Sequence, residues 1–322
     1  MGKIRTSVVI PVHDRVEYFE QAFASACAAT GDSDEILVVD DGSKPESHRK
    51  IKQIVSDRGS LMRITHGGPA AALNAGVAAA QGEYVATFSS DDVMHADHLD
   101  RSIDTLETEQ VAFSFCTPLV MQGDSYVDPN QSVFRAAGML HDVPKQKLAA
   151  HLFFVGNFLC APSMVTQRTT LAQLGPFNRS LLLLQDHEYW LRAQFHNLTL
   201  YISDFPTLTY RTAAEGNNLS SQYAERSAIE KSALISKALD NVSKSDLLDC
   251  FADVLGSGFE QFPLEISVIY LLLSHEDKFV RQSGFDRALK ILESEAGRAT
   301  LEETLGLDDK LLAEVMQMST HW

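Results

Sequence analysis

Residues 35–43 read EILVVDDGS, and residues 6–14 read TSVVIPVHD; these two stretches decide the expected fold. In each, a short apolar run, Glu35–Val39 or Thr6–Pro11, stops at a cluster of polar residues. Such runs are typical of strands buried on both faces of a parallel sheet. A third cluster, SSDD at residues 89–92, follows the apolar run Tyr84–Phe88. Because ligands collect at the carboxyl ends of parallel strands, we expect the three clusters to meet at one edge.

Helical patterns separate these strands. The expected helices are Val16–Thr30, one through Ile51 and Val55, Pro69–Ala80 and His95–Leu106, with a further strand at Leu61–Thr65. Later strands are expected near Ser163–Thr166, Thr199–Ile202 and Thr207–Arg211, with helices near Lys145–Phe154 and from Gln185. The alternation predicts an α/β fold with a Rossmann-like sheet and helices on both of its faces.

Beyond about residue 220 the strand signals stop. Ser243 and Asp246 form a capping pattern, and Pro263 suits a first helical turn. The chain is therefore expected to divide into an α/β domain at 1–220 and an all-helical region at 221–322. In that region Ile266, Val268, Ile269 and Leu272 form apolar faces that either pack on the first domain or mediate a homodimer.

Composition narrows the class of partner. The 322 residues hold 27 Lys and Arg against 43 Asp and Glu, a formal net charge of -16, which disfavours a nucleic-acid partner. The longest apolar run, Ile266–Leu273, is far shorter than the ~20 residues of a membrane span, and the start lacks the apolar stretch of a signal peptide. Four isolated cysteines indicate free thiols in a reducing compartment. We expect a soluble, cytoplasmic protein without a transmembrane segment.

The acidic clusters favour chemistry on a nucleotide-diphosphate sugar. Its two phosphates leave together and need a divalent cation, and Mg²⁺ or Mn²⁺ prefers carboxylate oxygen. Asp91 and Asp92 stand at a strand end suited to that role, and Asp40 at another could accept hydrogen bonds from a base or ribose. A separate carboxylate must take the proton of an attacking hydroxyl. Asp186, at the start of a helix, is placed for this.

The series of motifs is specific. In order they are TSVVIPVHDRVEYFEQAFASACAAT, DEILVVDDGS, GGPAAALNAGVAAAQGEYVATFSSDD, LGPFNRSLLLLQDHEYWLR, and LTYR followed by NNLS. Over about residues 5–220 this order and spacing resemble the inverting glycosyltransferases of family 2, which have the GT-A fold. The resemblance implies a nucleotide-sugar donor and a divalent metal, Mn²⁺ or Mg²⁺.

The resemblance also implies residue roles. The general base would be Asp186, and the metal ligands Asp91 and Asp92. The nucleotide-sugar site would comprise Pro11, Val12, His13, Asp14, Asp40, Asn74, Ser89 and Ser90. The acceptor side would comprise Gln185, Trp190 and Arg211.

The chain departs from the family pattern at several of these positions. Ser89 replaces the first acid of Asp-x-Asp, Gln185 replaces the Glu of Glu-Asp, and Leu73 replaces an Arg that contacts diphosphate in many members. These acidic residues also have purely structural interpretations. Asp40–Ser43 could be a turn, Asp91 and Asp92 a helix cap, and Asp186 a residue that only favours a helix N-terminus.

The leading interpretation is an inverting hexosyl- or N-acetylhexosaminyl-transferase that moves a sugar from a UDP-type donor to an acceptor hydroxyl. The acceptor would be a glycan, a lipid-linked glycan or a protein, in surface glycan or polysaccharide biosynthesis. The alternative is a catalytically weak or inactive sugar-nucleotide-binding partner subunit, as the departures suggest. A dinucleotide-dependent oxidoreductase is excluded because no Gly-x-Gly-x-x-Gly follows the first strand.

Overall fold

The computed structural model describes residues 3–123, 125–128, 134, 148–212, 224–240 and 242–305. Within these ranges a seven-stranded sheet has the order β10-β6-β9-β4-β1-β2-β3. Its strands are β1 (Thr6–Val12), β2 (Asp34–Asp40), β3 (Ser60–Arg63), β4 (Tyr84–Thr87), β6 (Phe113–Cys116), β9 (Val165–Gln167) and β10 (Leu200–Ser203). The expected mixed α/β architecture is confirmed.

The sheet is parallel with one exception. Val8 of β1 lies opposite Ile36 of β2 and Ala86 of β4, both in parallel register. Strand β9, however, runs antiparallel to both of its neighbours, β4 and β6. The expectation of an all-parallel sheet is wrong there, because an apolar run buried on both faces reads the same in either direction.

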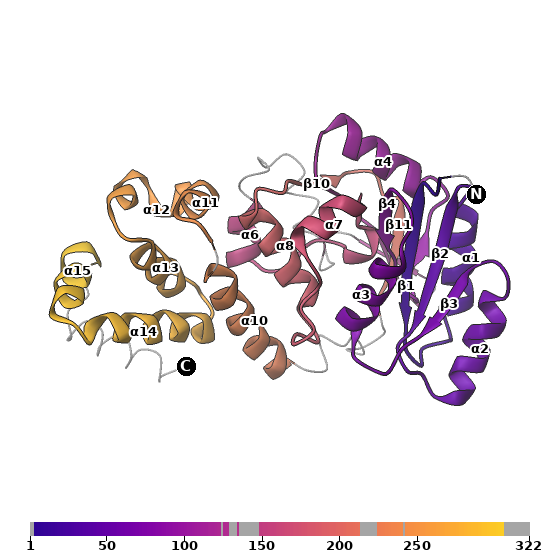
Figure 1. Ribbon diagram of the computed structural model, residues 1–322, viewed down its shortest axis with the longest axis horizontal. Helices are drawn as coiled ribbons and strands as arrows, with labels where there is room; N and C mark the ends of the chain where they lie inside the picture. Colours follow the sequence, from indigo (N-terminus) through magenta and orange to yellow (C-terminus); the bar gives the residue numbers. More distant parts are fainter. Residues whose placement is uncertain are drawn as a thin grey trace.

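Four helices flank the amino-terminal strands, close to their expected positions. They are α1 (Phe19–Ala29), α2 (Pro45–Val55), α3 (Pro69–Ala79) and α4 (His98–Thr108). Figure 1 shows α3 on one side of β1 and β2, with α1 and α2 on the other. Helix α3 packs closely because it is built of small residues: a Cβ on Gly76 would lie 2.3 Å from Cγ1 of Val9. This close packing brings the start of α3 beside the ends of β1 and β2.

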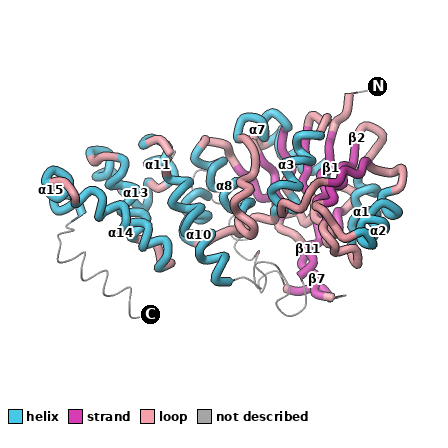
Figure 2. The backbone as a smooth tube through the Cα atoms, turned by 60° about the horizontal axis from the view of Figure 1, so that its bottom comes forward, coloured by secondary structure: helices cyan, strands magenta, loops and turns pink. Residues whose placement is uncertain are grey.

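A second, smaller sheet supports the acidic cluster at residues 89–92. Its strands, in the order β5-β11-β7-β8, are β5 (Val93–Met94), β11 (Leu208–Thr212), β7 (Leu119–Gln122) and β8 (Ser125–Val127). Figure 2 shows β11 and β7 side by side, below the main sheet in that view. The sequence predicts β11 but not β5, which is only two residues long. Because β5 directly follows Asp92, its antiparallel pairing with β11 anchors the cluster.

The middle of the chain covers the β6 side of the sheet. It contains α6 (Leu148–Phe154), the 3-10 turn η3 (Ala161–Ser163), α7 (Arg168–Leu174) and α8 (Gln185–Phe195). Residues 145–147, the expected start of α6, lie outside the described residues. Helix α8 packs against β6 through Trp190. The Trp190 ring contacts Phe113 and Phe115 edge-on at centroid distances of 5.8 and 4.9 Å.

From residue 224 onward the described chain is helical, as expected. Its elements are α10 (Ala224–Leu239), α11 (Lys244–Cys250), α12 (Ala252–Leu255), η4 (Ser257–Gln261), α13 (Leu264–Leu273), α14 (Lys278–Leu292) and α15 (Glu295–Leu305). The predicted cap is confirmed, because Ser243 Oγ accepts the Asp246 N–H at 3.1 Å. Pro263 directly precedes α13.

One apolar core joins the sheet to these helices. Phe251, at the end of α11, meets Phe153 of α6 and Phe195 of α8 at centroid distances of 5.2 and 6.1 Å. The core therefore crosses the expected boundary near residue 220, which itself falls outside the described residues, as do the NNLS residues at 217–220. A second cluster lies farther out, between α13, α14 and α15.

The apolar faces of α13 are covered within the chain. Ile266 and Ile269 belong to the outer cluster, Val268 and Leu272 to the main core, and all four are buried. These side chains are therefore not available for a homodimer. In the described part of the chain, no helix combines the length and apolar character that a membrane crossing requires. All four cysteines are described, and each is a free thiol.

Candidate active site

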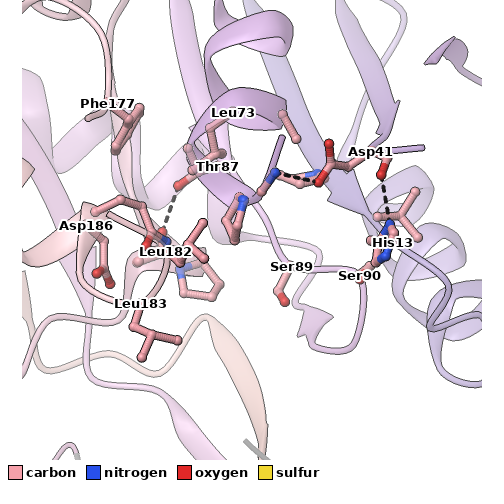
Figure 3. Close-up of a pocket in the computed structure, with 18 of the residues that line it drawn as sticks. His13, Asp41, Leu73, Thr87, Ser89, Ser90, Phe177, Leu182, Leu183 and Asp186 are labelled. Atoms are coloured by element: carbon pink, nitrogen blue, oxygen red, sulfur yellow. Dashed lines mark hydrogen bonds between the residues drawn. The ribbon is translucent and has the colours of Figure 1, made fainter. Parts of the chain in front are cut away.

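A cleft of about 650 Å³ lies at the carboxyl ends of β1, β2 and β4 and reaches the start of α8. Figure 3 shows His13 and Asp41 at one end of it and Asp186 at the other, with Ser89 between them. The sequence-predicted residues that line it are Pro11, Val12, His13, Ser89, Ser90, Asp91, Gln185, Asp186 and Trp190. Those that do not line it are Asp14, Asp40, Asn74, Asp92 and Arg211.

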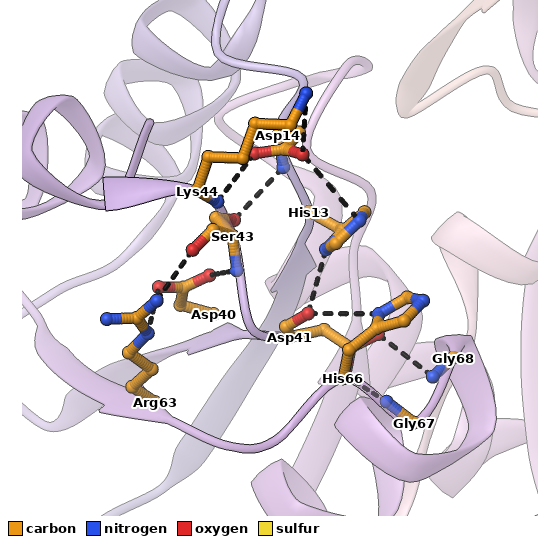
Figure 4. A network of polar contacts seen from close by, with 10 residues as sticks. All are labelled: His13, Asp14, Asp40, Asp41, Ser43, Lys44, Arg63, His66, Gly67 and Gly68. Atoms are coloured by element: carbon orange, nitrogen blue, oxygen red, sulfur yellow. Dashed lines mark hydrogen bonds and ion pairs between the residues drawn. The ribbon is translucent and has the colours of Figure 1, made fainter. Parts of the chain in front are cut away.

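The loops after β1 and β2 are tied together at the nucleotide end predicted from the sequence (Figure 4). Asp14, in the left-handed region with a φ of 54°, donates its N–H to Ser43 Oγ at 3.0 Å. Its carboxylate accepts the Lys44 N–H at 2.8 Å, and this bond is the main reason why its pKa is lowered. Asp14 therefore shapes the loop from behind rather than facing the cleft.

Asp40 is fully buried and bonded within the protein. Its carboxylate accepts the Ser43 N–H at 2.9 Å and lies 2.5 Å from His48 Nδ1 and 3.4 Å from Arg63 Nε. Burial opposes ionisation, but the hydrogen bonds from Ser43 and His48 outweigh it and lower the pKa of Asp40. All of these partners belong to the β2–α2 turn, to α2 or to β3, so this carboxylate stabilises the turn.

Asp41 is the acid of this pair that faces the cleft, and the sequence reasoning did not single it out. It accepts N–H groups of Gly67 and Gly68 at 2.8 and 2.9 Å and lies 2.9 Å from His66 Nδ1. The turn needs glycine at Gly42, whose φ is 69° and where a Cβ would lie 2.7 Å from His66 N. The signal available in the sequence was the tandem Asp-Asp itself.

Two imidazoles stack over Asp41. The rings of His13 and His66 have centroids 4.2 Å apart and an interplanar angle of 22°. His13 Nδ1 lies 2.8 Å from the Asp41 carbonyl oxygen, which can only accept, so this nitrogen carries the proton. Donor atoms of His13, Asp41 and His66 lie within 4.8 Å of one another, the one such group in the described part of the chain. Each already has a partner in the protein, and imidazole suits Zn²⁺ better than Mg²⁺.

At the end of β4, Asp91 and Asp92 point to different sides. Ser89 Oγ donates to Asp91, whose other carboxylate oxygen lies 3.8 Å from Arg15 Nη1, and this group faces the cleft. Asp92 is buried and accepts the Arg211 N–H at 2.8 Å, while its Oδ2 has no partner among the described residues. Burial, and then the charge of Asp91, raise the pKa of Asp92 well above its usual range. Burial thus disfavours ionisation of Asp92, which does not line the cleft.

Arg211 supports this cluster from behind. Its Nε donates to the Asp91 carbonyl at 3.0 Å, its Nη2 donates to Gln21 at 2.7 Å, and its guanidinium lies 4.2 Å from the Tyr18 ring centroid. It was predicted to lie on the acceptor side, but its position is at the back of the acidic cluster.

Asp186 lies at the second position of α8. Its Oδ2 accepts from the Asn157 side-chain amide and its Oδ1 from the His187 N–H, both at 2.8 Å. Burial outweighs these bonds and raises the pKa of the carboxyl. A carboxylate with a raised pKa is a stronger base than an exposed one, as proton abstraction requires. Beside it, Gln185 Oε1 and Trp190 Nε1 are buried without partners in the described ranges.

Asn74 makes its hydrogen bonds within the protein. Its Nδ2 donates to the Phe177 carbonyl at 2.9 Å, and its Oδ1 accepts the Phe177 N–H at 2.8 Å. The pair joins α3 to the loop that carries Phe177 to the cleft wall. The cleft also receives Arg226 of α10, which sequence reasoning assigned to the helical region and not to the site.

The comparisons with known proteins agree with this fold. S. aureus TarS 1–349 in complex with UDP-GlcNAc has a similar fold, with a TM-score of 0.59, 16% identity, and coverage of 89% of this chain and 83% of that one. The mannosyltransferase PcManGT of Pyrobaculum calidifontis, in complex with GDP-Man and Mn²⁺, covers 98% and 84% with a TM-score of 0.55 and 16% identity. The fold is thus that of GT-A glycosyltransferases.

The family follows from the sequence comparison. The profile described as glycosyl transferase family 2 matches residues 7–174, so the chain belongs to that family. An uncharacterised glycosyltransferase of Rickettsia felis is 26% identical over 190 residues, which are 58% of this chain and 31% of that relative. The chain thus matches about a third of this relative's length.

Proposed function

We propose that the chain is an inverting glycosyltransferase that moves a sugar from a nucleotide-diphosphate donor, of UDP type, to an acceptor hydroxyl. The proposal rests mainly on one observation: two separate carboxylates of different character line the same cleft. Asp91 stands beside Ser89 at the end of β4, and Asp186, with its raised pKa, stands at the start of α8. Inverting transfer needs this division, one acidic site for the diphosphate and one base for the acceptor.

The residues at the end of β4 fit a hard divalent cation. Asp91, Ser89 and Ser90 offer carboxylate and hydroxyl oxygens on the cleft, and Mg²⁺ is commonly bound by one or two carboxylates plus substrate phosphates. Asp91 would hold Mn²⁺ or Mg²⁺, with Ser89 orienting its carboxylate. When bound, the cation supplies positive charge to the departing diphosphate. Asp92, buried and outside the cleft lining, supplies no ligand in this arrangement.

Asp186 would take the proton of the acceptor hydroxyl. A bond forms between the acceptor oxygen and the anomeric carbon, the bond from that carbon to the phosphate oxygen breaks, and the nucleoside diphosphate leaves with the electron pair. Displacement at the opposite face inverts the anomeric configuration. Asn157 and the His187 N–H fix the carboxylate orientation, and Phe177, Leu182 and Trp190 line the same cleft with apolar surface.

The nucleotide would bind at the opposite end, along Pro11, Val12 and His13. We propose that Asp41 and the stacked His13 and His66 form its boundary, and that Asp14 and Asp40 act indirectly by holding the two loops. The hexosyl or N-acetylhexosaminyl class is a proposal prompted by the named sugars of the two fold neighbours. UDP-GlcNAc and GDP-mannose are therefore the first donors to test.

The same proposal includes a role in surface-glycan biosynthesis and an acceptor that is a glycan, a lipid-linked glycan or a protein. It also includes a cytoplasmic location and a homodimer. A homodimer would have to use surfaces other than the buried faces of α13. The alternative of a binding subunit without turnover is motivated by Ser89 and Gln185. Calorimetry with UDP and Mn²⁺ followed by donor hydrolysis separates the two, since binding without turnover of any donor favours the subunit.

The decisive variant is Asp186→Asn. Loss of a general base lowers the rate by about 10²–10⁴-fold, and we expect that loss in kcat with UDP affinity retained. The raised pKa of Asp186 also places the acidic limb of the wild-type pH profile above the range of an ordinary aspartate. Asp204→Asn, the same change at an exposed site, is the matched control. Full activity of Asp186→Asn would refute the assigned role.

A further inference from the structure

Helix α10, the first helix described after residue 220, carries a carboxylate on its buried face. Glu230 shares that face with Leu234 and Ile235, four and five residues further on, and only 6% of its surface is exposed. A carboxylate buried among apolar side chains is costly unless other groups satisfy it. The position of Glu230 therefore requires specific partners.

Those partners are three consecutive backbone N–H groups. The Glu230 carboxylate accepts from Leu182 at 3.1 Å, Leu183 at 2.8 Å and Leu184 at 3.2 Å. Successive N–H groups that converge in this way form an anion-binding nest, and here the chain supplies the anion itself. Arg226 Nε, one turn earlier, donates to the same carboxylate at 2.9 Å. Burial opposes ionisation, but Arg226 and the three N–H groups outweigh it and lower the pKa of Glu230.

The segment held in this way leads directly into the proposed base. Leu184 is the N-cap of α8 and makes no side-chain cap bond, and Asp186 follows two residues later. Leu182 and Leu183 line the cleft together with Asp186, and Figure 3 shows the three close to one another. Any shift of this segment would therefore move the Asp186 carboxylate.

We propose that Glu230 is a positioning residue for the transfer reaction. It fixes residues 182–184, and through them Asp186, so that a helix beyond both the family match at 7–174 and the expected domain boundary forms part of the catalytic apparatus. The proposal rests on the assignment of Asp186 as the base. Arg226, from the same helix, lines the cleft and forms an ion pair with Glu230. Helix α10 therefore contributes one residue to the wall of the cleft and one that holds residues 182–184.

The test compares Glu230→Ala and Glu230→Gln with Glu265→Gln in the full-length chain. Glu265 pairs with Arg287 at 3.1 Å within the helical region and is a matched acid that makes no bond to residues 182–184. Turnover is followed with UDP-GlcNAc or with whichever donor of the panel wild type uses, UDP binding by calorimetry with Mn²⁺, and amide hydrogen exchange over residues 180–188.

We expect Glu230→Ala to lower kcat by about 10²-fold, the cost of a catalytic group displaced by about 1 Å, with the Kd for UDP changed less than about threefold. Exchange over 180–188 should accelerate. Glu230→Gln keeps the shape and an acceptor oxygen, so it should recover about tenfold of the lost rate. Glu265→Gln should change none of these quantities.

Wild-type kcat and wild-type exchange in Glu230→Ala would overturn the proposal. So would equal losses of kcat and UDP affinity that Glu265→Gln reproduces, because that pattern marks general destabilisation. If Glu230→Ala does not fold, Glu230→Gln decides on its own: unchanged kcat and exchange refute the role. If wild type turns over no donor, the proposed function fails, while faster exchange in the variants still supports the anchoring of 182–184.

Discussion

The pKa values of Asp92 and Asp40 are shifted in opposite directions although both are buried acids at strand ends. Asp40 is surrounded by donors on Ser43, His48 and Arg63, and its pKa is lowered. Asp92 receives the single N–H of Arg211 and lies beside Asp91, and its pKa is raised. The number of donors that reach each carboxylate therefore decides whether hydrogen bonding or burial sets the direction of its pKa shift.

The raised pKa of Asp92 leads to a test of the metal assignment. Asparagine has the shape of a protonated aspartate, so Asp92→Asn should change the free energy of unfolding by no more than about 1 kcal/mol and keep most activity. Asp91→Asn should lose at least about 10²-fold in kcat because a bound metal contributes several kcal/mol to the transition state. Donor hydrolysis with a Mn²⁺ titration and thermal unfolding check both.

The pH dependence of the stability of Asp92→Asn tests the direction of the Asp92 pKa shift. The folded state holds the Asp92 proton more tightly than the unfolded state, so wild-type stability falls as pH rises above about 4. The asparagine side chain of the Asp92→Asn variant does not titrate, so the Tm of this variant minus that of wild type should grow between about pH 4 and pH 7. A difference that shrinks, together with activity as low as that of Asp91→Asn, would identify Asp92 as an ionised ligand.

The two Asp-Asp pairs also show what the sequence can and cannot predict at this scale. Both clusters were placed correctly at the edge of the sheet. In each pair one acid lines the cleft, Asp41 or Asp91, and its neighbour does not, because adjacent residues of an extended chain point to opposite sides. Which member faces outward depends on the turn after each strand, and the residue types do not reveal it.

At the scale of elements, α3 is fastened to the loop after α7 by Asn74. Asn74→Ala would leave the Phe177 N–H and carbonyl without their partner and should lower the free energy of unfolding by about 2 kcal/mol. Chemical denaturation measures this, and Gln173→Ala, at an exposed position of α7, is the control. A variant of wild-type stability with weakened UDP binding would instead support the place in the nucleotide-sugar site that the family resemblance implies for Asn74.

The elements themselves were largely predictable, since their apolar periodicities are strong. The direction of β9 was not, because burial on both faces leaves no mark of direction, and β5 was not, because two residues carry no pattern. Both strands matter to the site. Strand β5 anchors the acids at 91 and 92, and β9 separates β4 from β6.

At the scale of the molecule, the helical region is continuous with the α/β part rather than appended to it. Buried side chains of α10, of α11 and of the residue that follows α11 belong to the main core, among them the five side chains of Leu234, Ile235, Leu239, Leu247 and Phe251. His275, beyond α13, adds a bond from Nε2 to the Phe153 carbonyl at 2.9 Å. The outer cluster between α13, α14 and α15 is separate and small.

Two truncations test this division. A chain ending at Ser220 loses those five side chains, at about 1.5–3 kcal/mol each on burial, a sum comparable to the whole net stability of a typical domain. It also loses Glu230, so we expect aggregation and no turnover.

A chain ending at Glu293 loses α15 and, from the described core, only Leu301 of the outer cluster. We expect it to stay monodisperse and to keep activity within about threefold, because α15 belongs to that separate cluster. Light scattering, thermal unfolding and donor hydrolysis distinguish the outcomes, and a folded, active chain ending at Ser220 would show that the helical region is dispensable.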